Sequence, residues 1–150
     1  IHELLKLDVV PVINENDTVS VDEIRFGDND SLAALVAILI DADLTILLTD
    51  VDGLYTDNPS LNPAAEKIER VPEITAELEK IAGTAGSYVG TGGMKTKIEA
   101  ARIATSAGIP LVIASGKTPK IVYDIVHGKS VGTYFDAQPV IPHSRKSWII

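Results

Sequence analysis

The stretch LTILLTDVDG, residues 44–53, decides the fold class of this chain. Its first half, Leu44 to Leu48, is a continuous apolar run without the alternation of a half-exposed strand. Such a run predicts a β-strand that is covered on both faces. It ends abruptly in Thr49-Asp50 and in the turn residues Asp52-Gly53. A strand of this kind is typical of a parallel sheet that lies between helices.

The segments on either side of this strand predict helices. Upstream, Leu32, Leu35, Val36 and Leu39 follow the i, i+3, i+4, i+7 spacing of a helix that is buried on most sides. Downstream, residues 94–107 predict a second long helix, which ends before a glycine.

Further elements extend the alternation of strands and helices. Buried strands are predicted at residues 9–13 and 111–114 and helices at 74–82 and 119–126, with a hairpin at 18–26, a loop at 55–63 and short strands at 133–135 and 148–150. We therefore predict one α/β domain, a three-layer α/β/α sandwich with a mainly parallel sheet.

The composition excludes several classes of protein. The chain has 150 residues and a formal net charge of −8, which argues against a nucleic-acid partner. It has no cysteine, so neither disulfides nor thiolate metal sites can form, and we expect a cytoplasmic protein. The longest apolar run, residues 32–40, is too short to cross a bilayer. His2, His127 and His143 show no metal-ligand spacing and are interpreted as surface residues.

Polar residues follow the predicted strands at the sheet edge where α/β proteins bind ligands. These strand ends read Asn14-Glu15-Asn16-Asp17, Thr49-Asp50 and Ser115-Gly116-Lys117. A turn would explain one or two of the residues at 14–17, whereas four together favour substrate recognition, with Asp17 placed to meet an ammonium group. Thr49 and Asp50 could contact a nucleotide or only end a strand, while Asp52-Gly53 is interpreted as a turn.

A glycine-rich stretch, Gly90-Thr91-Gly92-Gly93-Met94-Lys95-Thr96-Lys97, precedes the second long helix. Its main-chain amides, the helix N-terminus and Lys97 could together bind phosphate groups. An ordinary glycine loop before a capped helix explains the same residues, and both interpretations remain open. The stretch matches neither the P-loop pattern nor the dinucleotide fingerprint.

Asp28-Asn29-Asp30 lies where the first long helix begins. A single N-cap would explain one of these side chains, and acidic residues favour the positive end of a helix. Three in a row exceed what capping requires. The functional alternative is that Asp30 orients donor groups or magnesium while Asn29 contacts the acceptor.

Four ordered motifs together resemble the amino-acid kinase family. They are residues 12–17, residues 27–30, Leu48-Thr49-Asp50 with residues 53–56, and residues 90–94 with Thr96-Lys97. The resemblance runs from about Val9 to Trp148, and the first and last motifs are most similar to members that phosphorylate glutamate. It implies an amino-acid kinase-like fold and ATP-dependent formation of glutamyl 5-phosphate, the first step of proline synthesis.

The resemblance also implies a role for each motif. Asn14, Asp17 and Asn29 would bind L-glutamate, Asp30 would organise the catalytic groups, and Lys97 would neutralise charge on the transferred phosphate. ATP would be bound by Thr49, Asp50, Thr91, Gly92, Gly93, Met94, Lys95, Thr96 and Lys97. Mg²⁺ bridging the phosphates and a homo-oligomer, a dimer or a tetramer, are further expectations.

The chain departs from the family pattern because the family's first half is absent from these 150 residues. We therefore expect residues 1–150 to form the C-terminal, ATP-binding part of an amino-acid kinase domain, inactive unless the rest is supplied. Another acceptor within the family, or a nucleotide-binding fragment without catalysis, remains an alternative.

Overall fold

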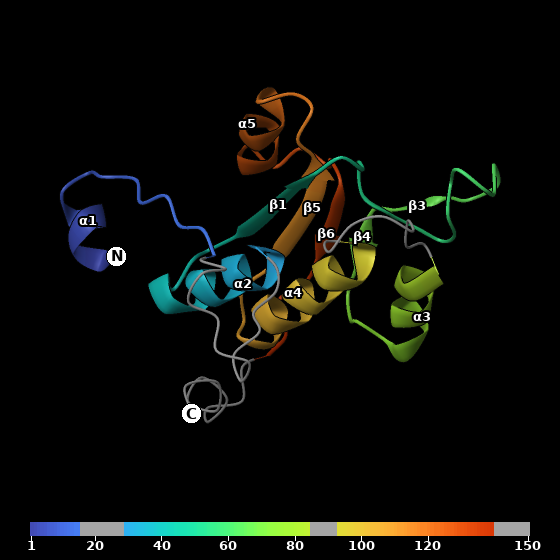
Figure 1. Cartoon of the computed structure of the whole chain (residues 1–150), viewed down its shortest axis with the longest axis horizontal. Helices are drawn as coiled ribbons and strands as arrows, with labels where there is room; N and C mark the ends of the chain where they lie inside the picture. The colour runs from blue at the N-terminus through green and yellow to red at the C-terminus, as the bar shows by residue number, and fades with distance from the viewer. Residues whose placement is uncertain (16–28, 85–92, 140–150) are drawn as a thin grey trace.

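The computed structural model describes residues 1–15, 29–84 and 93–139. A four-stranded sheet lies at its centre, with helices on both faces (Figure 1). The strands follow the order β1-β5-β6-β4, with β1 at Thr45–Thr49, β5 at Leu111–Ser115, β6 at Thr133–Phe135 and β4 at Arg70–Val71. The β1–β5 and β4–β6 pairs are parallel and the β5–β6 pair is antiparallel, so the prediction of a mainly parallel sheet is confirmed.

Strands β1 and β5 are in register along their whole length, from Thr45 opposite Leu111 to Thr49 opposite Ser115. Because the two strands run parallel, their carboxyl ends meet at one edge of the sheet. This edge is where polar residues were predicted to gather.

Two helices cover one face of the sheet, α2 at Asn29–Ile40 and α4 at Met94–Ser106. They pack against each other through small side chains, all at most 6% exposed: Ala34, Ala37, Ala100, Ala101 and Ala104. Of the predicted apolar positions of α2, Leu32, Leu35 and Val36 are half-buried and Leu39 is 60% exposed, so the most deeply buried apolar side chains of this helix are its alanines. Alanines form the contact between the two helices because their small side chains let the backbones approach closely. The bulkier side chains lie beside this contact.

The opposite face of the sheet carries α5 at Lys120–Val126. Ile125 of this helix is buried against Val112 and Ala114 of β5, in a small core separate from the main one. The three layers are therefore α2 with α4, the sheet, and α5, as predicted (Figure 1).

A two-stranded hairpin and a third helix flank α4. The hairpin pairs β2, Leu54–Tyr55, with β3, Lys67–Ile68, and α3 spans Ala76–Thr84. Thr133 of β6 ties the hairpin to the sheet, because its buried hydroxyl accepts from the Leu54 N–H at 2.8 Å and donates to the Ile68 carbonyl at 2.6 Å. The preceding Gly132 has φ +75°, and a Cβ there would lie 2.2 Å from the Ile113 carbonyl oxygen.

The predicted strand at residues 9–13 is wrong. After the short helix α1, His2–Lys6, this segment forms no strand, and Val10 and Val12 are 84% and 95% exposed. An apolar run becomes a strand only where a sheet offers it a partner edge, and within residues 1–15, 29–84 and 93–139 none pairs with it.

The predicted hairpin at 18–26 falls mainly within residues 16–28, and the strand at 148–150 within 140–150, so both lie outside the described residues. Among the helices of the described ranges, none has the length and apolarity needed to cross a membrane.

Candidate active site

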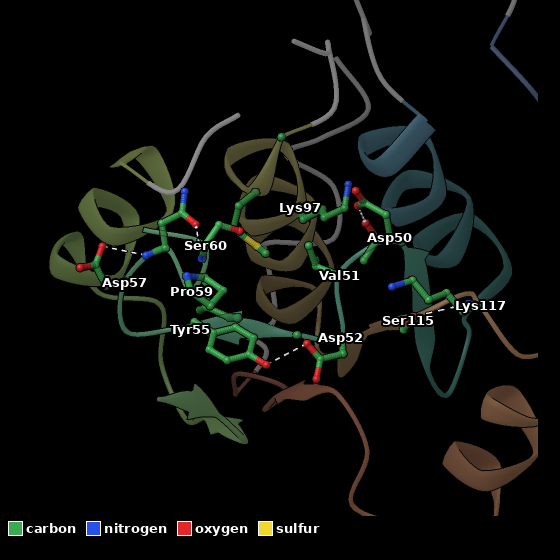
Figure 2. A pocket seen from close by; sticks show the side chains of 16 residues that line it. Asp50, Val51, Asp52, Tyr55, Asp57, Pro59, Ser60, Lys97, Ser115 and Lys117 are labelled. Carbon is green, nitrogen blue, oxygen red and sulfur yellow. Dashed lines mark hydrogen bonds between the residues drawn. The ribbon is translucent and has the colours of Figure 1, made fainter. Parts of the chain in front are cut away.

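A cavity of about 560 Å³ opens at the carboxyl ends of β1 and β5 (Figure 2). This volume lies within the range of small-molecule sites. Its lining comes from the chain that follows β1, the start of α4 and the turn after β5. The cavity therefore lies at the edge where sequence motifs predicted ligand binding.

Asp30 lies behind the helix side of the cavity, in contact with the lining residue Lys97 but not itself part of the lining. Its Oδ2 atom accepts hydrogen bonds from the Lys97 Nζ at 3.1 Å and from the Thr96 hydroxyl at 2.8 Å. The Lys97 and Asp30 side chains are only 10% and 19% exposed. The Thr96 hydroxyl also lies 2.8 Å from the Gly93 carbonyl, so its one proton is shared between two acceptors. Asp30 thus joins the first turns of α2 and α4, and the structure brings together the two predicted catalytic residues.

The predicted nucleotide residues divide into those that line the cavity and those that do not. Thr49, Asp50, Gly93 and Met94 line it, as does Lys97. The Thr49 hydroxyl donates to the Asp50 carboxylate at 3.0 Å, and the Asp50 side chain is exposed. Lys95, which is exposed, and Thr96, whose hydroxyl contacts Asp30, are not part of the lining. Thr91 and Gly92 lie outside the described residues.

The opposite side of the cavity was not predicted from the sequence. Tyr55 donates a hydrogen bond of 2.9 Å to Asp52, whose other oxygen lies 3.5 Å from the Lys67 Nζ. The Asp52 carboxylate raises the pKa of Tyr55, because its hydrogen bond favours the neutral phenol and burial and charge repulsion disfavour the phenolate. Asp52 was interpreted as a turn residue and Tyr55 as the start of a loop.

Asp57, further along the same segment, is held by amide donors. It accepts from the Asn62 side chain at 2.9 Å and from the Asn58 N–H at 2.7 Å. The hydrogen bond from Asn62, followed by that from Asn58, holds the pKa of Asp57 below its usual value. A sequence signal could have indicated this side of the cavity. It is the group of Asp50, Asp52, Tyr55 and Asp57, which follows a strand that ends at the ligand-binding edge of the sheet.

The predicted acceptor residues lie near a second hollow, of about 390 Å³, between α2 and the segment before it. Asn14 and Asn29 both line it, and the Glu15 N–H donates to the Asn29 side chain at 3.3 Å. The structure therefore brings Asn14 close to the start of α2, as the shared role requires. Asp17 lies outside the described residues.

Metal ligation by protein groups alone finds little support. In the described part of the chain, no group of three or more His, Cys, Asp or Glu side chains could hold a metal ion. A divalent ion at this cavity would take most of its ligands from a phosphorylated substrate and from water.

Comparisons with known proteins show which family the chain resembles. Residues 1–115 match the sequence model of the amino acid kinase family. The chain is 53% identical over 150 residues to the glutamate 5-kinase of Picosynechococcus sp., covering 99% of this chain and 40% of that one. It is 50% identical over 147 residues to glutamate 5-kinase 2 of Bacillus subtilis, covering 97% of this chain and 40% of that one.

The fold has counterparts among solved structures. Carbamate kinase from Giardia lamblia, bound to AMP-PNP, superposes with a TM-score of 0.54 at 30% identity, covering 73% of this chain and 32% of that chain. The present chain spans about 40% of the length of the curated relatives that it matches first.

Proposed function

The chain belongs to the amino acid kinase family, and we propose that the protein of which it forms part transfers the γ-phosphoryl group of ATP to the side-chain carboxylate of L-glutamate. The likeness to two glutamate 5-kinases over nearly the whole chain carries this proposal. The product would be glutamyl 5-phosphate, and the described residues would supply the nucleotide side of the reaction.

The cavity suits the phosphate chain of a nucleotide. Among the described residues no side chain caps the N-terminal turn of α4, so the N–H groups of Met94 and Lys95 would be available to phosphate oxygens at the positive end of the helix. Lys97 adds a cation from the same turn, and Thr49 and Asp50 would contact the nucleotide from β1. The similar carbamate kinase structure is bound to AMP-PNP, which supports a nucleotide as a ligand of this fold.

The reaction needs no covalent enzyme intermediate. A glutamate side chain is ionised at neutral pH, so its carboxylate oxygen attacks the γ-phosphorus directly. A bond forms between the carboxylate oxygen and the γ-phosphorus while the bond between the γ-phosphorus and the β–γ bridging oxygen breaks. ADP leaves with the electron pair of the broken bond. Lys97 offsets the charge that develops on the transferred group, and Asp30 positions the Lys97 ammonium through their 3.1 Å contact.

Magnesium fits this donor set in the manner usual for nucleotide enzymes. Mg²⁺ commonly binds phosphate oxygens and water with only one or two carboxylates, and Asp50 offers an exposed carboxylate at the cavity. When bound with the nucleotide, the ion would neutralise phosphate charge.

The chain would form the C-terminal, ATP-binding part of the kinase domain. Strand β1 is an edge of the described sheet, with Leu48 49% exposed, and the apolar residues Val10 and Val12 lie in water. These surfaces would be covered by the remainder of the domain. A homo-oligomeric state and a cytoplasmic location remain predictions from the family resemblance.

The first test is ADP release by the intact protein with magnesium, ATP and a panel of acceptors: glutamate, aspartate, acetylglutamate, carbamate and uridylate. Stimulation by glutamate alone is the expected result. Stimulation by a different acceptor would keep the fold and overturn the substrate. ATP binding without turnover on any acceptor would favour a nucleotide-binding module.

Two variants of the intact protein separate the two halves of the site. Lys97→Ala should lower kcat by roughly 10²-fold, because one charge-stabilising group is lost from the transition state. Asp17→Ala should chiefly raise the KM for glutamate. Unchanged kinetics in both variants would contradict the site assignment, and Lys120→Ala on α5 is the matched control.

A further inference from the structure

We propose that Lys117 is a further nucleotide-binding residue, whose ammonium group contacts the phosphate chain from the β5 side of the cavity. The proposal rests on the ATP-binding role proposed above and adds to it a specific cation. Lys117 lines the cavity and extends toward it from the end of β5, on a different element from Lys97 (Figure 2).

The main chain around Lys117 is held against the end of β1. Ser115 lies opposite Thr49 in the parallel pair, and the Gly116 N–H donates to the Thr49 carbonyl at 2.8 Å. The Lys117 N–H in turn donates to the Ser115 hydroxyl at 3.4 Å. A Cβ at Gly116 would lie 3.3 Å from the Leu48 Cβ, so this turn packs closely on the strand that supplies Thr49 and Asp50. The main chain at Lys117 is therefore held at the rim of the cavity, and its exposed side chain starts from there.

The charges of the cavity explain why a second cation would favour nucleotide binding. The lining holds three carboxylates, those of Asp50, Asp52 and Asp57, and two lysines, Lys97 and Lys117. A nucleotide polyphosphate entering among three carboxylates is repelled unless cations offset them. Lys97 is already paired with Asp30, so part of its charge is engaged.

Lys117 differs from Lys97 in its partners. In the described ranges no carboxylate forms an ion pair with Lys117, whereas Asp52 is paired with Lys67. An exposed ammonium group that has no carboxylate partner among the described residues, on a main chain held beside the nucleotide residues of β1, is available to phosphate oxygens. The ordinary alternative is a solvated surface lysine with no ligand.

The test compares lysines close together in the sequence in the intact protein. Lys120 lies three residues further along, is paired with Asp124 at 3.4 Å and does not line the cavity. Dissociation constants for ATP, ADP and adenosine would be measured by calorimetry for Lys117→Ala, Lys117→Arg, Lys120→Ala and the wild type.

Lys117→Ala should weaken ATP and ADP about tenfold, which corresponds to one charge-assisted contact, and leave adenosine unchanged. Lys117→Arg should retain most of the affinity and Lys120→Ala all of it. Equal ADP affinity in Lys117→Ala and the wild type, or an equal loss for adenosine, would overturn the inference.

Measuring glutamate-dependent ADP release by the wild type distinguishes a failure of the Lys117 inference from a failure of the proposed function. A wild type that phosphorylates glutamate, with Lys117→Ala binding ADP normally, would overturn only the role of Lys117. A tenfold loss in Lys117→Ala in a protein that does not respond to glutamate would overturn only the substrate. No ATP binding by the wild type would overturn both.

Discussion

The two walls of the cavity are held by different kinds of contact. On the helix wall, Asp30 joins α2 to α4 through Lys97 and Thr96, with the charged side chains at most 19% exposed and packed alanines beneath them. On the hairpin wall, residues 50–68, the contacts of Asp52 and Asp57 are made in exposed positions.

The difference in exposure decides what each contact contributes. A solvated ion pair or hydrogen bond stabilises a protein by roughly 0–1 kcal/mol, whereas removing one partner of a largely buried pair costs several times more. We infer that the helix wall determines the geometry for phosphoryl transfer. The exposed contacts of the hairpin wall can change with little loss of stability, unlike its buried attachments through Leu54 and the Thr133 hydroxyl.

The largest effect is expected from Asp30→Ala on the helix wall. Lys97, 10% exposed, would lose the carboxylate that it is paired with, and we expect the free energy of unfolding to fall by about 3 kcal/mol. Urea unfolding of the intact protein measures it. Asp43→Ala, an exposed carboxylate before β1, is the matched control and should change stability by less than about 0.5 kcal/mol. Equal unfolding midpoints for the two variants would show that the buried pair does not hold the helix wall.

A second substitution tests the buried attachment of the hairpin wall. Thr133→Val keeps the side-chain shape but leaves the Leu54 N–H and the Ile68 carbonyl without their partner, at a position that is 0% exposed. We expect a loss of about 2 kcal/mol.

Thr133→Ser is the control for this substitution, because it keeps the hydroxyl and loses one methyl group, worth about 0.8 kcal/mol. A valine variant as stable as the serine variant would contradict the anchoring role. It would also weaken the distinction between the buried attachment of the wall and its exposed contacts.

The parts of the fold that the sequence predicted are those determined by local pattern. Strands β1 and β5 and helix α4 matched their predicted ranges to within one residue, because each is a continuous apolar run or a long periodic segment. The two-residue strands β3 and β4 are too short to leave such a pattern. Residues 9–13 were mispredicted because their burial depends on a partner strand, which periodicity does not reveal.

The residues of the site likewise divide into those that the sequence or the family resemblance predicted and those that only the three-dimensional structure reveals. Asp30 and Lys97 are 67 residues apart in sequence, and only the likeness to a family placed them at one site. Tyr55, Asp52 and Lys67 meet because β2 pairs with β3, and a two-residue pairing cannot be read from composition. The sequence places Lys117 at a strand end but does not identify it as a cation of the cavity, because its lack of a carboxylate partner among the described residues emerges only in three dimensions.

The smallest effect is expected from Tyr55→Phe on the hairpin wall. It removes the 2.9 Å hydrogen bond to Asp52, which is solvated, so the loss at pH 8 should be at most about 0.5 kcal/mol. Asp52 raises the pKa of Tyr55 above 10 in the folded chain, so folding favours the neutral phenol. This stabilisation is fully present below the unfolded pKa and is lost as the pH rises through the folded one.

The difference in urea midpoint between wild type and Tyr55→Phe should therefore be constant near neutral pH and shrink above about pH 10. Tyr123→Phe, on α5 away from the cavity, controls for the general effect of alkali on tyrosines. A difference that stays constant to pH 11 would mean that the phenol is held by packing rather than by the carboxylate. The hairpin wall would then share the buried character of the helix wall, and the contrast between the two would rest on Asp57 alone.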